Sequence, residues 1–305
     1  MDHEVRSGVR AAIAAYVFWG LLTVYWKWLS DFDPIELIGW RILCATVVLA
    51  AIITQRRRWP VLLSALHNRR LVGRLAVAAV LLTANWTGYV WAVANDRIIE
   101  TALGYFMAPL GTMILGVTVL HEHASRLQKL AIALAALAVV VLTVSYGRPP
   151  IVALVIAATW STYGLLKRQV PLSPVESLAG ETFLLTIPAA VLVLVMAGSG
   201  DSIPSTASGG DWALVLLTGV VTAAPLLLFA VAAQRIPFTL LGALQYLVPT
   251  INLLLGWFVY KEPMPLDRLI GFALVWAALV AVAVDQVSTA PRRVDEHRLS
   301  PTAGS

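Results

Sequence analysis

Long apolar blocks of about 20 residues, separated by short clusters of charge, dominate this chain. A block of that length crosses the ~30 Å hydrocarbon core of a bilayer as a helix that rises 1.5 Å per residue. Only 13% of the residues are charged, whereas a soluble domain has about 25%. None of the blocks alternates in polarity as the strands of a membrane barrel do. The pattern predicts an all-α polytopic membrane protein.

Ten membrane helices are expected, at residues 8–29, 34–54, 74–95, 99–120, 126–146, 149–167, 174–197, 212–233, 238–260 and 266–286. Between the second and third, Trp59-Pro60 followed by Leu62, Leu63 and Leu66 favours a short helix in the membrane interface, with a plain basic loop as the alternative. The first span has no obvious cleavage site before it, so it is expected to remain a membrane helix. Residues 291–305 are polar and predict a disordered cytoplasmic tail.

The distribution of basic residues predicts an orientation. An even number of spans puts both termini on one side, and the segments of that side carry 16 Lys and Arg, against five on the other. The positive-inside rule then predicts cytoplasmic termini. The same clustering beside apolar spans accounts for the net charge of +5 without a nucleic-acid partner. The single cysteine, Cys44, excludes an intramolecular disulfide, and neither a metal site nor a cofactor is expected.

The second half of the chain repeats landmarks of the first. Three residues near the end of the fourth expected helix recur 140 positions later in the ninth: Pro109, Gly116 and Glu122, as Pro249, Gly256 and Glu262. A Pro-X-Glu motif at 34–36 recurs at 174–176 with the same offset. We therefore expect two homologous halves, 1–146 and 147–290. Each holds five helices, an odd number, so the second half enters the membrane from the opposite side, as in many secondary transporters.

Two charged residues occupy equivalent positions inside the membrane. Arg41 and Glu181 each stand seven residues beyond the proline of their Pro-X-Glu motif. A charge facing lipid is costly, so neither side chain should face it. They could form a buried pair that fixes helix packing. Alternatively, they could form a central site, with Arg41 for an anionic substrate group and Glu181 for an amine or a proton. Glu181 is the candidate for proton coupling, because a carboxyl group in a low dielectric is readily protonated.

Other polar and aromatic residues fall near the same depth. A pocket for an amphipathic solute combines stacking surface with a few hydrogen-bonding groups. The further candidates for substrate binding are Asn85, Trp86, Tyr105, Gln245 and Tyr246. Ordinary packing is the alternative for Trp86. Glu122 and Glu262 end their helices and are expected to organise a helix turn or bind a neighbouring loop.

Several motifs resemble the RarD branch of the EamA family, in the drug/metabolite transporter superfamily: AAYVFWG, ELIGWRIL, NW followed by WAVAND, LGYFMAPL, YGLLKR, ETFLL and LQYLVPT. The resemblance covers residues 8–286. It implies two inverted EamA repeats, a bacterial plasma membrane and alternating access. Helices one to four and six to nine of that superfamily surround the cavity, which would place there Arg41, Asn85, Tyr105, Glu181 and Gln245. The family's chloramphenicol-sensitive label leaves the cargo open, since one fold serves many substrates.

We therefore expect a secondary-active inner-membrane permease or exporter of a small amphipathic metabolite or drug, with proton coupling as a further hypothesis. Its expected partners are a small-molecule substrate and the lipid bilayer. The protein is expected to be a monomer or a weak homodimer and not an enzyme. The alternative is a non-transporting membrane sensor or assembly protein.

Overall fold

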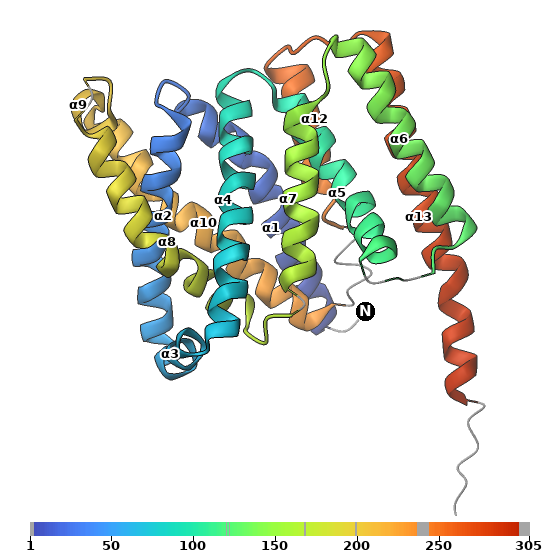
Figure 1. Cartoon of the computed structure of the whole chain (residues 1–305), viewed down its shortest axis with the longest axis horizontal. Coiled ribbons are helices and arrows are strands. Elements are labelled where there is room, and N and C mark those ends of the chain that lie inside the picture. Colours follow the sequence, from blue (N-terminus) through green and yellow to red (C-terminus); the bar gives the residue numbers. More distant parts are fainter. Residues whose placement is uncertain are drawn as a thin grey trace, which may run out of the picture.

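The computed structural model describes residues 3–119, 121, 123–167, 169–198, 200–236 and 244–298. Within them the elements are α1 (His3–Trp28), α2 (Pro34–Gln55), α3 (Trp59–His67), α4 (Arg69–Ala94), α5 (Ile98–Thr118), α6 (Arg126–Tyr146), α7 (Ile151–Lys167), α8 (Pro174–Met196), α9 (Ile203–Thr206), α10 (Gly209–Arg235), α12 (Leu247–Leu254), a π-helical turn η1 (Leu255–Val259) and α13 (Leu266–Arg298). Figure 1 shows the long helices standing side by side, with α3 and α9 at opposite ends of the bundle.

The membrane-spanning set matches the ten expected helices. Seven helices of the described residues are long and apolar enough to cross a membrane: α1, α2, α4, α5, α6, α8 and α10. The shorter apolar helices α7 and α12–η1, together with α13, complete the ten. The start predicted for the ninth helix falls partly on residues 237–243, outside the described residues. The all-α, ten-helix fold is confirmed.

The C-terminal helix is longer than the sequence suggests. α13 continues to Arg298, so residues 291–298 are helical where we expect a disordered tail. Once a helix is nucleated, each added residue gains a hydrogen bond at little further cost, so a membrane helix can extend beyond the bundle. Residues 299–305 lie outside the described residues.

Eight of the helices form a closed ring, in the order α2, α8, α4, α7, α5, α12, α1, α10 and back to α2. Exchanging each helix for its counterpart in the other half (α1 with α7, α2 with α8, α4 with α10, α5 with α12) gives the same ring. α1 begins at the end of the bundle that carries the N-terminus, whereas α7 begins at the opposite end (Figure 1). The two halves are therefore inverted repeats.

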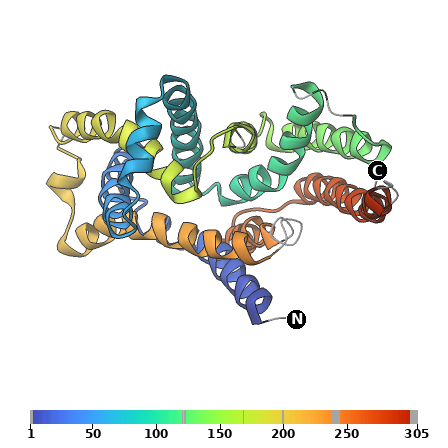
Figure 2. The ribbon, with the colours of Figure 1, turned by 90° about the horizontal axis from the view of Figure 1, so that it is seen from below.

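The two remaining long helices lie outside the ring. α6 and α13 pack extensively against each other and contact the ring through α5. Gly271 of α13 permits this close packing, because a Cβ atom there would overlap the Leu142 side chain of α6. Figure 2 shows this pair at one end of the molecule. The arrangement agrees with the family resemblance, which places the fifth and tenth helices away from the cavity.

The repeated Pro-X-Glu motifs mark the starts of α2 and α8. Pro34 and Pro174 occupy the first helical positions, where the missing N–H has no helical partner in any case. The side chain of Asp33 caps α2, and that of Ser173 caps α8 in a capping box with Glu176. A capping side chain followed by proline therefore starts the second helix of each half.

A hydrogen bond between equivalent residues marks the pseudo-twofold axis. Thr46 and Thr186 are 140 positions apart, and their Oγ1 atoms are 3.0 Å from each other. Thr46 stands near the middle of α2, and Thr186 near the middle of α8. A residue contacts its own counterpart only on a twofold axis, so the axis passes between α2 and α8 at mid-helix.

The short helix expected between the second and third spans is present as α3. Leu62 is fully buried, whereas Leu63 is 49% exposed. The ring of Trp59 stacks on Phe183 of α8 at 5.7 Å. The adjacent Arg58 forms an ion pair with Glu176 at 2.5 Å. α3 therefore docks on the opposite half of the protein, and its place in the membrane interface stays a prediction.

Candidate functional site

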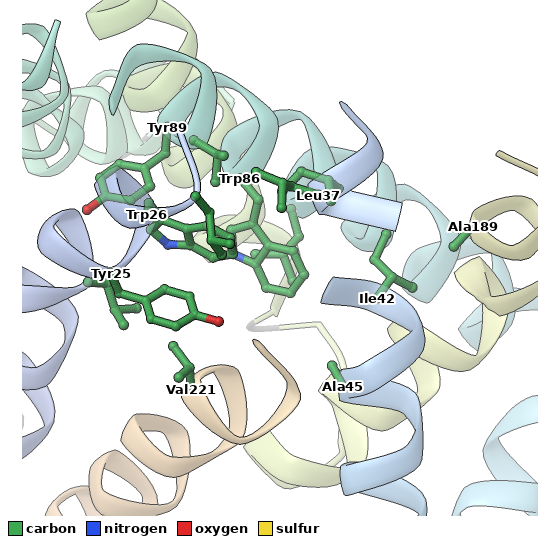
Figure 3. Close-up of a cluster of buried hydrophobic side chains, with 14 of the residues drawn as sticks. Tyr25, Trp26, Leu37, Ile42, Ala45, Trp86, Tyr89, Ala189 and Val221 are labelled. Carbon is green, nitrogen blue, oxygen red and sulfur yellow. The ribbon is translucent and has the colours of Figure 1, made fainter. Parts of the chain in front are cut away.

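Arg41 lies in the interior of the ring, 5% exposed. Its Cζ atom is 3.8 Å from the ring centroid of Trp86 in α4 and 5.1 Å from that of Trp26 in α1. Its Nε donates a hydrogen bond to Oγ1 of Thr222 in α10 at 3.1 Å. Figure 3 shows the cluster of buried hydrophobic side chains to which Trp26 and Trp86 both belong. Side chains from three other helices thus hold the guanidinium.

Arg41 and Glu181 do not pair with each other. No Asp or Glu oxygen of the described residues lies within 4.0 Å of the Arg41 nitrogens. Glu181 is fully buried and forms an ion pair with Lys167 at 2.6 Å. It also accepts hydrogen bonds from Tyr163 at 3.1 Å and from Ser177 at 2.9 Å. The two equivalent charges therefore have separate environments, one aromatic and one ionic.

Asn85 and Tyr105 join α4, α5 and α7 beside this cluster. The Tyr105 hydroxyl donates to Oδ1 of Asn85 at 3.1 Å. The Asn85 amide donates to the Ile156 carbonyl at 3.2 Å and to Oγ1 of Thr159 at 3.0 Å. Asn85 thus connects Tyr105 of α5 to the backbone and a side chain of α7.

A row of aromatic rings connects the Arg41 region with the Glu181 region. Tyr89 lies 6.0 Å from Tyr105, Tyr105 lies 6.1 Å from Trp160, and Trp160 lies 5.9 Å from Tyr163, measured between ring centroids. Tyr163 then reaches Glu181 through its hydroxyl. A continuous series of ring contacts from α4, α5 and α7 thus links the two charged sites.

Gln245 and Tyr246 lie apart from these residues. The ring of Tyr246 stacks on Phe106 at 6.4 Å, and Phe106 in turn lies 6.5 Å from Phe272 of α13. Gln245 is partly buried at the turn before α12. In the described part of the chain, neither side chain has a hydrogen bond or ring contact with the Arg41 cluster. The structure therefore brings together Arg41, Trp86, Asn85 and Tyr105, but not Gln245 and Tyr246.

Several polar residues of the ring carry no visible signal in the sequence. The hydroxyl of Thr23 in α1 lies 2.8 Å from the hydroxyl of Tyr89 and donates to Oδ1 of Asn252 in α12 at 2.9 Å. Lys167 reads as a loop charge in the sequence, yet its side chain turns inward to Glu181. Its position, 140 residues after Lys27, is the one signal that could have singled it out.

Glu262 organises a helix start, as the sequence predicts. Its carboxylate accepts hydrogen bonds from the backbone N–H groups of Ile98 at 2.6 Å and Ile99 at 2.9 Å, at the beginning of α5. Burial raises the pKa of Glu262, and these two hydrogen bonds oppose that shift. Its counterpart, Glu122, lies outside the described residues.

The other candidate regions are less suited to binding chemistry. A cavity of about 240 Å³ lies at the α3 end of the bundle, but its polar lining includes Arg58 and Glu176, which already pair with each other. Among the described residues no group of three His, Cys, Asp or Glu side chains could hold a metal ion. The Arg41 cluster is therefore the candidate functional site.

An inverted duplication that encloses intramembrane charges defines a class, the polytopic membrane proteins built like secondary transporters. The chain belongs to the EamA-like transporter family, whose model matches residues 6–144 and again 148–284. The protein is therefore a multi-pass membrane transporter, and the resemblance to the RarD branch is confirmed by its relatives.

Protein RarD of Streptomyces exfoliatus is 39% identical, over 95% of this chain and 92% of its own length. Protein RarD of Escherichia coli K12 is 32% identical, over 95% and 98% of the two chains. An uncharacterized transporter of Bacillus subtilis, YojE, is 37% identical over 94% and 97%. A solved crystal structure has a TM-score of 0.57 at 19% identity, over 92% of this chain and 98% of that chain, which shows a shared fold.

Proposed function

We propose that the protein is a secondary-active transporter of the bacterial inner membrane that moves a small amphipathic solute by alternating access around Arg41. The single observation that carries this proposal is a buried guanidinium without a carboxylate partner among the described residues, inside a ring of two inverted halves. A fixed buried pair would serve packing alone, whereas an unpaired cation is costly and favours a ligand.

The two halves, 1–146 and 147–290, act in this proposal as the moving bodies, with both termini in the cytoplasm. A monomer is sufficient, because the ring closes within one chain. Glu181 is the proposed proton carrier. The ion pair with Lys167 supports this role, because a proton taken up by the Glu181 carboxylate would break that pair.

Counterflow in proteoliposomes tests the proposal. The panel contains amino acids and chloramphenicol, the latter because one relative, from Pseudomonas aeruginosa, is named a chloramphenicol-sensitive protein. We expect exchange of at least one solute by the wild-type protein, loss of exchange in Arg41→Ala, and loss of proton dependence in Glu181→Gln. Wild-type exchange rates in both folded variants would contradict the central site. No exchange of any solute in a broad panel would favour a sensor or assembly protein.

A further inference from the structure

The guanidinium of Arg41 presents free donors in its own plane. Its Cζ atom lies over the ring of Trp86 at 3.8 Å and over that of Trp26 at 5.1 Å, and its Nε donates a hydrogen bond to Thr222. The two Nη atoms carry four N–H groups, and no hydrogen bond joins them to any described residue. Stacking leaves the in-plane edge of a guanidinium open, and that edge matches a carboxylate with two parallel hydrogen bonds.

Two further side-chain donors, one in α1 and one in α12, are buried without a hydrogen-bond partner among the described residues. Nε1 of Trp26 and Nδ2 of Asn252 belong to the four buried side-chain atoms of the described residues that have no hydrogen bond. Trp26 is 1% exposed and Asn252 is fully buried. Thr23, one turn before Trp26 in α1, donates a hydrogen bond to the amide oxygen of Asn252. A buried unsatisfied donor costs about 1–3 kcal/mol, so native structures rarely keep one without use.

The charge of the cluster is a single positive unit. The titratable groups that act on Arg41 are the phenols of Tyr25, Tyr89 and Tyr105, and all three are neutral at physiological pH. Among the described residues of α1, α2 and α12, the buried unpaired groups are therefore one cation and two neutral N–H donors. A ligand that satisfies them must be rich in acceptors and carry one negative charge, because a dianion would leave an uncompensated charge in a low dielectric.

We propose that the Arg41 cluster binds the carboxylate of a monoanionic solute. The carboxylate accepts two hydrogen bonds from the Nη atoms of Arg41, and its remaining lone pairs face the donors of Trp26 and Asn252. The apolar body of the solute lies against the rings of Tyr89 and Tyr105. This assignment rests on the proposed transport function and names the class of substrate for its central site.

Binding of three matched probes tests the assignment. Thermal unfolding of the full-length detergent-solubilised protein is measured with phenylacetate, with phenylacetamide, its neutral isostere, and with phenyl phosphate, a dianion. We expect a concentration-dependent rise in the unfolding temperature with phenylacetate and none with the other two. Equal shifts with phenylacetate and phenylacetamide would overturn the proposal, and a larger shift with phenyl phosphate would reassign the site to phosphate.

Substitutions separate the roles of the donors. Arg41→Gln should abolish the phenylacetate shift. Trp26→Phe keeps an aromatic face but removes the N–H group, and it should weaken phenylacetate binding about tenfold, the loss of one hydrogen bond to a charged group. Trp28→Phe is the matched control, because Trp28 belongs to the same helix and is 64% exposed. An unchanged affinity in folded Trp26→Phe would contradict the site even if Arg41→Gln failed to fold.

The outcomes also separate this assignment from the proposed function. Selective binding of phenylacetate without counterflow of any solute would support the carboxylate site and contradict transport. Counterflow of neutral solutes at rates equal to those of carboxylates would support transport and contradict the carboxylate site.

Discussion

Arg41 and Lys167 are both largely buried cations, and they differ in what lies opposite them. Lys167 faces Glu181 at 2.6 Å, whereas Arg41 faces indole rings and one hydroxyl group. Removal of one member of a buried ion pair leaves the other charge uncompensated, and removal of an unpaired charge does not. The two cations should therefore respond differently to the same substitution.

Arg41→Met should leave the unfolding temperature unchanged or raise it while it abolishes transport. The methionine keeps an unbranched apolar stem between Trp26 and Trp86 and removes a desolvated charge. Thermal unfolding in detergent, together with proteoliposome counterflow, measures both effects. A marked loss of stability would show that Arg41 is a structural residue and not a binding residue.

Lys167→Met should lower stability by about 3 kcal/mol, the lower end for a broken buried pair. The lower end applies because the Lys167 side chain remains 23% exposed. The double variant Lys167→Met/Glu181→Gln should recover most of the loss, because the neutral amide that replaces the Glu181 carboxylate can still bond to Tyr163 and Ser177. Chemical unfolding of the two single variants and the double variant gives the coupling energy. Additive losses would contradict a coupled pair.

At the scale of single elements, polar caps fix how the helices meet. Glu262 follows η1 in the second half and binds the first N–H groups of α5 in the first half. A carboxylate there complements the partial positive charge of a helix start. Glu262→Ala should cost about 1–2 kcal/mol, as lost N-caps do, measured by thermal unfolding in detergent. Asp31→Ala, at an exposed position, is the control and should have no effect; an equal effect of the two substitutions would contradict the capping role.

Helix starts could be predicted because their signals are local. Pro34 and Pro174 favour the first turn of a helix, and the apolar length that follows sets the span. α9, with four residues, is too short to show a periodicity. The π-helical turn η1 contains Gly256, which packs closely against Ile99 of α5, and this contact between distant segments has no local signal. The partner of a buried charge is likewise set by tertiary contacts, so the sequence places Arg41 and Glu181 in the interior but does not show that Lys167 pairs with Glu181.

At the scale of the whole molecule, the pseudo-twofold axis divides the contacts between the two halves into two kinds. When the halves exchange conformations, the distance between a residue and its own counterpart is the same in both end states. Thr46 and Thr186 form such a pair. The second kind lies off the axis and changes during the cycle. The contact of α1 with α10 belongs to it: when the halves exchange conformations, α1 and α10 adopt the less extensive contact that α7 and α4 have in this structure. Alternating access should therefore preserve the first contact and open the second.

Disulfide crosslinks test this distinction in a Cys44→Ala background, which removes the single native cysteine. An oxidised Thr46→Cys/Thr186→Cys pair should leave counterflow nearly unchanged, since the crosslink lies on the axis. A Gly8→Cys/Arg235→Cys pair joins α1 to α10, where a Cβ atom on Gly8 lies 2.7 Å from Cβ of Arg235, and it should stop counterflow until a reductant is added. Loss of transport in the axial pair, reversed by reductant, would contradict an exchange of conformations between inverted halves. Unimpaired transport in the oxidised α1–α10 pair would instead show that this interface stays closed throughout the cycle.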